Sequence, residues 1–323
     1  MKRFLLASFL TLSALLPACQ LDSAVVVCED GTTPGPTPTP TSLQQLYTQM
    51  GAPVQTFTYD PSRTNIVTGG KGTVFTIPAN AFVKNGQVVK SPVELAFREI
   101  FSRADMVLSN MPTVANGRLL ESAGEVYLRT DQDTSLRLAP GATIQLQMPN
   151  PAINPRPDSM SLFVGPGRTG ANPLNDCFSW NPNIDPTSSL TPVAGGHVVT
   201  VSSTLYNKGI GWFNCDRFYS TPNPQAITVT LPFIDIDPAK NTMVFAVFRD
   251  FNGSLRLCDF TAPGTFKTTG VPLGSAVSIF VIRTVNSKLY YGRQDGTVQA
   301  GVPFTPTLQE TTPAALEAEL NRL

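Results

Sequence analysis

The chain has 323 residues, of which 41% are hydrophobic and only 14% are charged, and its 23 basic and 23 acidic residues leave no net charge. A neutral chain without a basic surface does not favour polyanions, so we expect no nucleic-acid partner. The single histidine, His197, leaves little for His-based metal or acid–base sites, and no GxSxG, P-loop or HExxH motif occurs. We therefore predict a non-enzymatic protein with no catalytic residue, no metal site and no cofactor.

The first 18 residues are predicted to be an export signal. Residues 1–3 give a short basic start, and the apolar run of residues 4–16 is shorter than the roughly 20 residues that a membrane-spanning helix needs. The run ends in Leu16-Pro17-Ala18-Cys19, which resembles the lipobox of bacterial lipoproteins. The resemblance implies cleavage after residue 18, lipid on Cys19 and, because Gln20 is not Asp, the outer membrane. The alternative is a plain secretory signal with an incidental cysteine.

A Thr/Pro-rich tether is predicted over residues 19–52. Residues 31–42 consist only of Gly, Thr, Pro and Ser, a composition that cannot bury a core and that extends as polyproline II at about 3.1 Å per residue. Residues 42–47 are expected to form a short helical turn. The tether would hold a folded body away from the membrane, facing the periplasm or the cell surface.

Four cysteines remain once Cys19 is set aside, and in an exported chain an even number suggests disulfides. Four thiols allow three full pairings, and the sequence does not choose among them. One bridge within the second half is the leading expectation, with unpaired buried thiols as the alternative. The candidates are Cys28, Cys177, Cys215 and Cys258.

Alternating hydrophobicity predicts antiparallel strands along most of the remaining chain. In residues 143–148 every second residue is apolar, which is typical of a strand with one buried face. Strands of this kind are also predicted at residues 73–77, 93–100, 125–129, 197–203, 226–231, 243–248, 254–260, 276–285 and 297–302.

Residue pairs that favour tight turns separate some of these predicted strands, and one segment near the end favours a helix. Asn85-Gly86, Asn252-Gly253 and Asp295-Gly296 supply the residue types that tight hairpin turns require. Residues 312–320 predict the one clear helix, because Thr312 is suited to cap it and Pro313 to occupy its first position.

The fold class that follows is all-β, with two antiparallel β-sandwich-like domains. We expect the first domain at residues 53–150 and the second at 196–323. The Pro-rich connection of residues 151–195 separates them, and its residues 161–165 and 177–180 suggest a bridging hairpin.

The first domain resembles a ZU5 domain over residues 65–150. A glycine pair precedes a strand and an Ile-Pro-x-x-Ala turn within residues 69–82, and residues 124–128 and 140–146 are similar to later ZU5 strands. The segment of residues 211–218, Gly-Trp-Phe-Asn-Cys-Asp-Arg-Phe, is similar to one in the β-rich second half of bacterial lipoproteins of this kind.

This resemblance implies a β scaffold used for protein contact. Some animal ZU5 modules cleave themselves between Phe and Ser with help from a preceding His. Phe178-Ser179 would supply that dipeptide here, but Cys177 stands in place of the His and His197 lies 18 residues downstream of Ser179. Self-cleavage is therefore a minor alternative.

Three further groups of residues are candidate sites. Residues 131–135 begin like a calcium loop but lack its turn glycine and closing Glu, which favours a solvated hairpin. Asp235 and Asp237 alternate along an expected strand and would share a face, where they could hold a cation or act as an acid pair. Trp180 and Trp212 are candidate ligand contacts, because exposed aromatic faces stack on sugar rings.

The expected function is that of a lipid-anchored cell-envelope protein acting as a non-enzymatic protein-interaction, adhesion or assembly module. The expected partners are the membrane, through lipid on Cys19, and either another envelope protein or a glycan. A polysaccharide-binding surface lipoprotein is the first alternative, and a self-cleaving ZU5-type module is the second.

Overall fold

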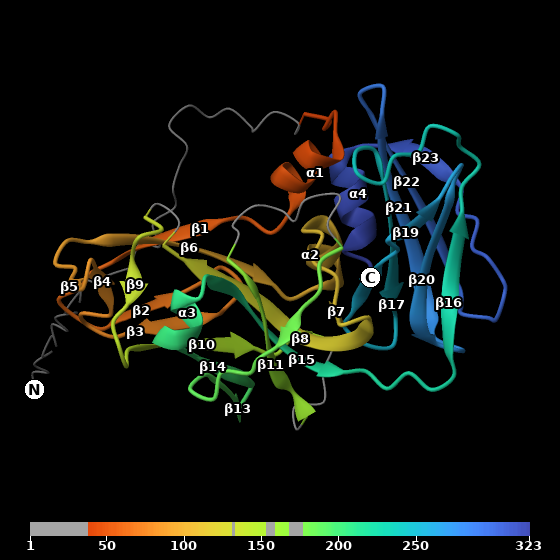
Figure 1. The fold of residues 1–323 in the computed structure, drawn as a ribbon. Helices are drawn as coiled ribbons and strands as arrows, with labels where there is room; N and C mark the ends of the chain where they lie inside the picture. The colour runs from red at the N-terminus through yellow and green to blue at the C-terminus, as the bar shows by residue number, and fades with distance from the viewer. Residues whose placement is uncertain (1–37, 131–132, 153–158, 168–176) are drawn as a thin grey trace, which may run out of the picture. The chain divides into compact units, whose positions relative to one another are not determined.

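Antiparallel strands are the predominant secondary structure of the described residues, so the all-β prediction is confirmed (Figure 1). The computed structural model describes residues 38–130, 133–152, 159–167 and 177–323. Residues 38–323 form one compact unit. The export signal, Cys19, Cys28 and the part of the tether before residue 38 lie outside the described residues.

The first sheet runs in the order β1-β6-β8-β15-β11-β12, with β7 also paired to β8. All of its strand pairs are antiparallel. Its strands are β1 (Gln55–Tyr59), β6 (Val93–Ile100), β7 (Val114–Ala115), β8 (Arg118–Arg129), β11 (Ser161–Pro166), β12 (Asn181–Pro182) and β15 (Ile210–Phe218).

The second sheet packs against one face of the first. Its order is β13-β14-β10-β3-β2, formed by β13 (Ser189–Val193), β14 (Gly196–Ser202), β10 (Thr143–Pro149), β3 (Val74–Ile77) and β2 (Asn65–Thr68). The two sheets share a core in which Phe97 and Val126 of the first sheet meet Phe75 and Leu146 of the second. A small sheet, β5 (Gln87–Val88), β4 (Phe82–Lys84) and β9 (Arg137–Leu138), adds Phe82 and Leu138 to that core.

The C-terminal part forms two more sheets around a core of their own. The third sheet is β16 (Pro224–Thr230), β20 (Thr265–Pro272) and β19 (Asp259–Thr261). The fourth has the order β18 (Ser254–Arg256), β17 (Thr242–Phe248), β21 (Ala276–Val285), β22 (Lys288–Thr297) and β23 (Leu308–Thr311). Val229 and Phe266 from the third sheet meet Val244 and Ile279 from the fourth.

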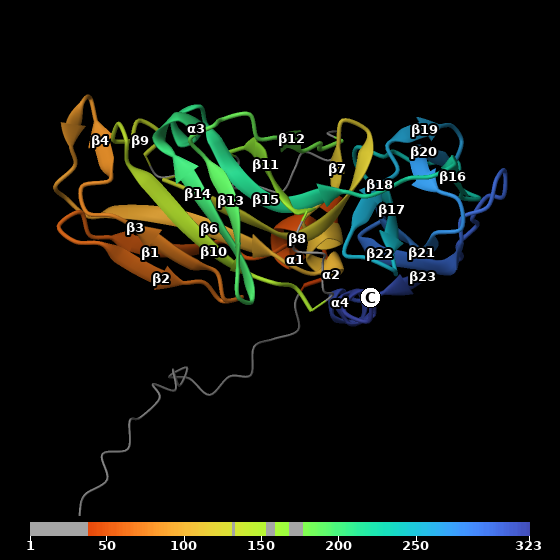
Figure 2. The same cartoon turned by 90° about the horizontal axis from the view of Figure 1, so that it is seen from below.

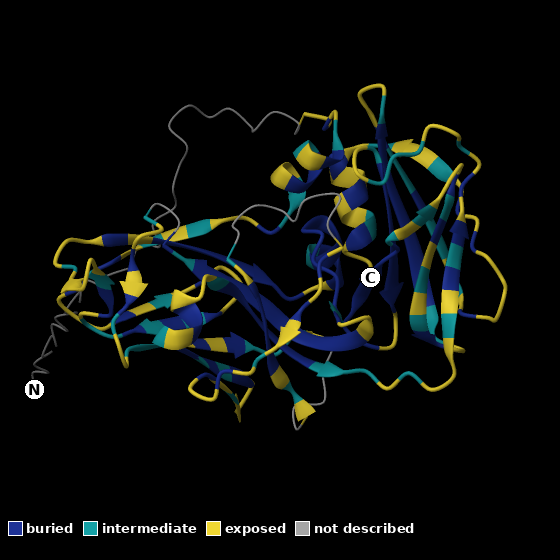
Figure 3. Ribbon diagram, viewed as in Figure 1, coloured by how far each residue is buried: buried dark blue, intermediate teal, exposed yellow. Residues whose placement is uncertain are grey.

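Three of the four helices among the described residues cover the other face of the fourth sheet. They are α1 (Leu43–Met50), α2 (Arg103–Leu108) and α4 (Pro313–Leu320), and α3 (Ser203–Asn207) lies beside β9 and β14. Leu46, Val107 and Leu316 from these helices pack on Phe245 and Phe280 and form a third core. Because both faces of β17 are covered, all seven of its residues are buried (Figure 3).

Helix α2 also contributes to a fourth core, on the face of the first sheet that points away from the second sheet. Met106 of α2 packs there with Tyr127 of β8 and Trp212 of β15. The same helix supplies Val107 to the core below the fourth sheet. A six-residue helix therefore joins the packing of the N-terminal and C-terminal sheets.

Several local predictions are confirmed. Strand β10 shows the expected alternation of buried and exposed side chains. Asn85 and Gly86 have positive φ angles of 50° and 77° in the turn between β4 and β5. The predicted C-terminal helix is α4, and the Thr312 side chain accepts a hydrogen bond from the Ala315 backbone N–H. The short helix expected near residue 42 is α1, capped by Ser42.

Two predicted elements near the end of the chain are wrong. Asp295 and Gly296 do not form a hairpin turn, because they pair with Ser278 and Val277 within the β21–β22 ladder, near the end of the ladder that lies away from its turn. The turn lies instead at Asn286-Ser287, where both residues have positive φ angles of 50° and 58°. The strand predicted at residues 297–302 is also absent, since β22 ends at Thr297.

The expected domain boundary does not coincide with the division between sheets. Strand β14, assigned by sequence to the second domain, pairs along its whole length with β10. Strand β15 pairs with β8 and β11 in the first sheet. The N-terminal sheets therefore take in residues up to Phe218, because the Pro-rich connection returns the chain to complete them instead of beginning a new core.

Candidate functional site

The two tryptophans proposed as ligand contacts are core residues, so that prediction is wrong. Trp180 is 0% exposed and Trp212 is 2% exposed. Their rings meet edge to face at 6.4 Å, and Trp180 Nε1 donates to the carbonyl of Pro112 at 3.2 Å. Both side chains fill the fourth core beside Tyr127 and Phe163, where a sugar ring has no access.

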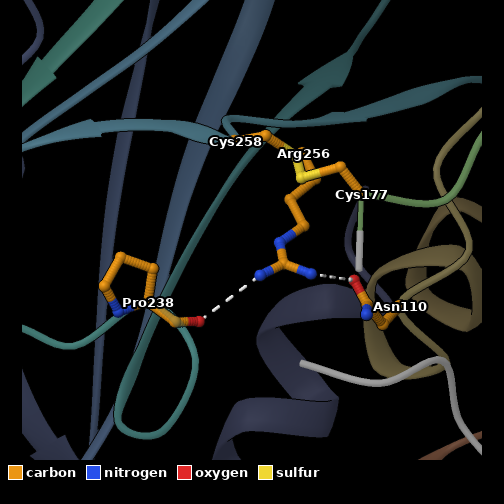
Figure 4. Close-up of a disulfide and its surroundings, with 5 residues drawn as sticks. All are labelled: Asn110, Cys177, Pro238, Arg256 and Cys258. Carbon is orange, nitrogen blue, oxygen red and sulfur yellow. Dashed lines mark hydrogen bonds between the residues drawn. A yellow bond between two sulfur atoms is a disulfide. The ribbon is translucent and has the colours of Figure 1, made fainter. Parts of the chain in front are cut away.

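One disulfide forms among the described cysteines, between Cys177 and Cys258, which lie 81 positions apart in the sequence. It ties the segment before β12 to the segment between β18 and β19. Near it, Arg256 donates to Asn110 Oδ1 and to the carbonyl of Pro238, both at 3.4 Å (Figure 4). The bridge thus connects the N-terminal and C-terminal sheets covalently at a place where side chains already join them.

The third described cysteine, Cys215, is a buried free thiol in the first core. Burial, and to a lesser extent the neighbouring Asp216 carboxyl, raises the pKa of this thiol. A thiol held in its neutral form is a weak nucleophile. Cys215 therefore contributes packing, and Cys28 lies outside the described residues.

Buried polar side chains gather on β15, which contains the segment of residues 211–218, and on its neighbour β8. Asn214 and Asp216 are both 0% exposed. Asn214 Nδ2 donates to Asp216 Oδ2 at 2.7 Å, and the Ser122 hydroxyl on β8 lies 3.2 Å from Asn214 Oδ1. Asn252, from the loop after β17, donates to the carbonyl of Ser122 at 3.0 Å. A polar cluster therefore crosses the junction between the two halves of the fold.

Glu125 lies opposite Asn214 in the ladder, and it is 0% exposed. Neither of its carboxyl oxygens has a hydrogen-bond partner among the described residues. Burial, and then the nearby Asp216 and Asp105 carboxyls, raise the pKa of Glu125 well above its usual value. Burial also raises the pKa of Asp216, although hydrogen bonds from Ser122 and Asn214 oppose the change. Burial and the neighbouring carboxyls therefore favour the neutral form of Glu125 over its charged form.

At the end of β15, charged residues approach the surface. Arg217 forms an ion pair with Glu121, which faces it directly across the ladder on β8. The pair is largely buried, with side-chain exposures of 18% and 7%. The Arg217 Nε atom is buried and has no hydrogen-bond partner among the described residues.

Arg217 lines two surface pockets. The larger, of about 610 Å³, lies between β11, β12 and β13 and includes Phe218. The smaller, of about 390 Å³, includes Tyr219, Asp250 and Ser275. Figure 2 shows the end of β15 beside β11 and β12 on one side and the start of the C-terminal sheets on the other. We name the two pockets together with Arg217 the β15 groove.

The other candidate residues do not assemble into a site. Ser179 Oγ accepts from the Asn116 backbone N–H at 3.0 Å beside the first sheet, whereas His197 lies in the second sheet opposite Met148. Ser179 thus lies outside the strands beside the first sheet, whereas His197 lies within the second sheet.

The prediction that Asp235 and Asp237 share a strand face is also wrong, because both lie in the loop between β16 and β17. Asp235 pairs with Arg283 at 2.6 Å, and Asp237 pairs with Lys240 at 3.2 Å. Across the described ranges no group of three or more His, Cys, Asp or Glu side chains is placed to hold a metal ion. No helix within those ranges is long and apolar enough to cross a membrane.

Sequence reasoning missed the buried charges of this site. Glu121 and Glu125 gave one available signal, since they are the two charged residues in a run, residues 119–128, that is otherwise apolar except for Ser122. Their depth and partners depend on β15, which lies about 90 residues away in the chain. No protein-family model, no curated protein and no solved structure matches this chain.

Proposed function

We propose that this protein is a lipid-anchored cell-envelope protein that acts as a non-enzymatic protein-interaction, adhesion or assembly module. The observation that carries the proposal is the order of segments along the chain. A lipobox-like Leu16-Pro17-Ala18-Cys19 and a Thr/Pro-rich tether precede a body whose described part, residues 38–323, is one compact unit. An anchor, a spacer and a folded body are the parts that a protein needs to contact something beyond the membrane surface.

The ZU5-like segment supports the choice of a contact module. Its glycine pair, its strand and its Ile-Pro-x-x-Ala turn fall on the loop before β3, on β3 and on the turn before β4. The disulfide between Cys177 and Cys258 supports an extracytoplasmic location, since such bonds persist in oxidising compartments.

The anchor is tested by replacing Cys19 with Ser in the full chain, expressed in a Gram-negative host. We expect the wild-type chain to incorporate a radiolabelled fatty acid and to partition with the outer membrane, and Cys19→Ser to do neither. Cys28→Ser is the matched control, because it removes a nearby thiol outside the lipobox and should behave as wild type. Equal membrane partitioning of Cys19→Ser and wild type would refute the anchor.

The two alternative functions, self-cleavage and polysaccharide binding, need different evidence. Self-cleavage needs two fragments divided between Phe178 and Ser179, and the intact mass of the purified chain detects them directly. Polysaccharide binding can no longer use Trp180 and Trp212, which are buried. It needs another surface.

A further inference from the structure

Strands β1 and β2 form two neighbouring open edges on one side of the N-terminal sheets. β1 is the terminal strand of the first sheet and β2 that of the second. Their partners β6 and β3 pack together, since the rings of Phe97 and Phe75 lie 4.7 Å apart, so both edges are on the same side (Figure 2). Among the described residues, the backbones of β1 and β2 have no hydrogen-bond partner beyond β6 and β3. The outward N–H and C=O groups of both strands are therefore available to another strand.

The other sheet edges in the described part of the chain have features that discourage pairing with a further strand. Pro182, Pro192 and Pro224 lie in the edge strands β12, β13 and β16. Charged residues, Arg137 and Glu310, lie in β9 and β23. Strands β5, β7, β18 and β19 have three residues or fewer. β1 and β2 contain no proline, no charged residue and no bulge, and an edge of that kind is a template for another strand.

Side-chain hydrogen bonds hold the two edges in a fixed relation. At one end the buried Glu99 carboxylate accepts from Gln55 Nε2 of β1 and from the Lys71 backbone N–H in the β2–β3 turn, both at 2.9 Å. At the other end, Asn65 of β2 accepts from the Asp60 backbone N–H at 2.9 Å and donates to the Asp60 carbonyl at 2.8 Å. The edges are therefore preorganised, which lowers the entropic cost of pairing.

Exposed apolar side chains accompany these edges. Ile66 of β2 is 70% exposed, and Val54, directly before β1, is 51% exposed. Phe57 of β1 is half-buried between the two sheets, with its ring 6.1 Å from Phe75 and 5.9 Å from Phe97. Apolar side chains without charged neighbours on the strand are typical of the centre of a protein interface.

A second copy of this chain fits these edges because each edge is complementary to itself. A two-fold axis perpendicular to the sheets brings the same strand of two copies together in antiparallel orientation. Since neither strand carries a charge, no like charges face each other across the pair. Residues directly opposite in an antiparallel pair share a face, so the symmetry places a single residue of β2, Ile66 or Val67, opposite itself.

We propose that two copies of this protein pair through their β2 edges, with the β1 edges beside them, so that both sheets continue from one copy into the other. The paired edges form a strip of roughly 17 Å by 20 Å, or about 340 Å² per copy, which is less than the roughly 800 Å² of a stable interface. The pairing is therefore weak and reversible, and it is favoured where anchored copies are confined to one membrane surface. This inference goes beyond the proposed function, because it names the partner as the chain itself.

Single cysteines on β2 test the pairing by position. Ile66→Cys and Val67→Cys are made separately in the full chain carrying Cys28→Ser, so that Cys28 cannot form the cross-link. Opposite residues of an antiparallel pair have Cα atoms about 4.5–5.5 Å apart, which suits a disulfide. We expect mild oxidation in the host envelope to give a covalent dimer with at least one of them. Gln147→Cys, exposed on β10 within the same sheet, is the matched control and should stay monomeric.

Three outcomes of the cross-linking would overturn the inference. They are the absence of a dimer with both β2 cysteines, an equal yield of dimer with Gln147→Cys, and a cross-link from β2 only to a different envelope protein.

Ile66→Lys tests the same edge at equilibrium. Sedimentation equilibrium of the purified full chain in excess detergent should give a wild-type dimer with a Kd below about 100 µM. Ile66→Lys should weaken it at least about tenfold, because the lysines of both copies would meet near the axis. Ile184→Lys, at an isoleucine that is 92% exposed after β12, is the matched control and should dimerise as wild type.

Both lysine variants should keep the thermal midpoint of wild type, since both isoleucine side chains are exposed. A wild-type chain that stays monomeric up to that concentration, or an equal Kd in all three proteins, would refute the pairing. Neither the cross-link nor the Kd reads lipid attachment, so a failure of the pairing is distinguishable from a failure of the anchor.

Discussion

The Cys177–Cys258 disulfide is expected to stabilise the fold mainly by restricting the unfolded chain. It closes a loop with a sequence separation of 81. Loop-closure entropy for that length is about −15 cal/mol/K, which corresponds to about 4.5 kcal/mol at 25 °C as an upper value. Replacing both cysteines, in Cys177→Ser/Cys258→Ser, should therefore lower the free energy of unfolding by roughly 2–4.5 kcal/mol.

The folded state gives little reason for additional loss. Cys177 is exposed, and its neighbour Trp180 is held independently, because the Trp180 backbone N–H donates to the carbonyl of Val114 at 2.7 Å. Arg256 keeps its two acceptors, Asn110 and Pro238. The serines should leave the native packing in place and act on the unfolded ensemble.

Urea denaturation followed by tryptophan fluorescence measures the effect, since Trp180 and Trp212 both lie in the core. We expect the double variant to have a lower midpoint and a larger dependence on urea, because its unfolded chain exposes more surface. Wild type in a thiol reductant should reproduce the variant, and the reductant should not affect the variant itself. Identical midpoints for wild type with and without reductant would refute the entropic argument.

Two further substitutions test the buried carboxyl and the close approach beside it. Burial and the Asp216 and Asp105 carboxyls raise the folded-state pKa of Glu125 above its ordinary value of 4.5. At a pH above that ordinary pKa the folded state therefore binds more protons than the unfolded state, and the protein loses stability as the pH rises. Glu125→Gln should therefore have a higher urea midpoint than wild type at neutral pH and a weaker pH dependence from pH 5 to 8; parallel pH profiles would contradict this. Gly124 has a φ of 130°, and an added Cβ would lie 2.3 Å from the Phe101 ring. In urea unfolding, Gly124→Ala should lower the free energy of unfolding by about 1–3 kcal/mol more than Gly141→Ala does. Gly141 is the control because its φ is also positive, at 77°, but an added Cβ would meet nothing within 4 Å. Equal losses in the two variants would show that the Phe101 ring moves aside at no cost.

The pairing of the cysteines is one feature that could not be inferred from the sequence. Their number and the export signal predicted a bridge, but three full pairings remained open. The pairing depends on where β18 and the segment before β12 meet, and that is fixed by contacts such as Thr113 with Ser254. For the same reason the β15 groove could not be predicted from the sequence, since its walls come from β11, β13 and the C-terminal sheets.

The sequence by itself determined the local conformation of the body. Alternation produced β10, the Asn85-Gly86 pair produced a hairpin turn, and Thr312 with Pro313 began α4, because each of these depends on side chains only a few residues apart. Tertiary structure alone decided which strands pair and which side chains are buried. Strand β15 joined β8 across the expected domain boundary, and this pairing placed Trp212 in a core and Arg217 beside the surface. An alternating pattern shows that one face of a strand is covered, but the covering partner is chosen by packing between residues far apart in the chain.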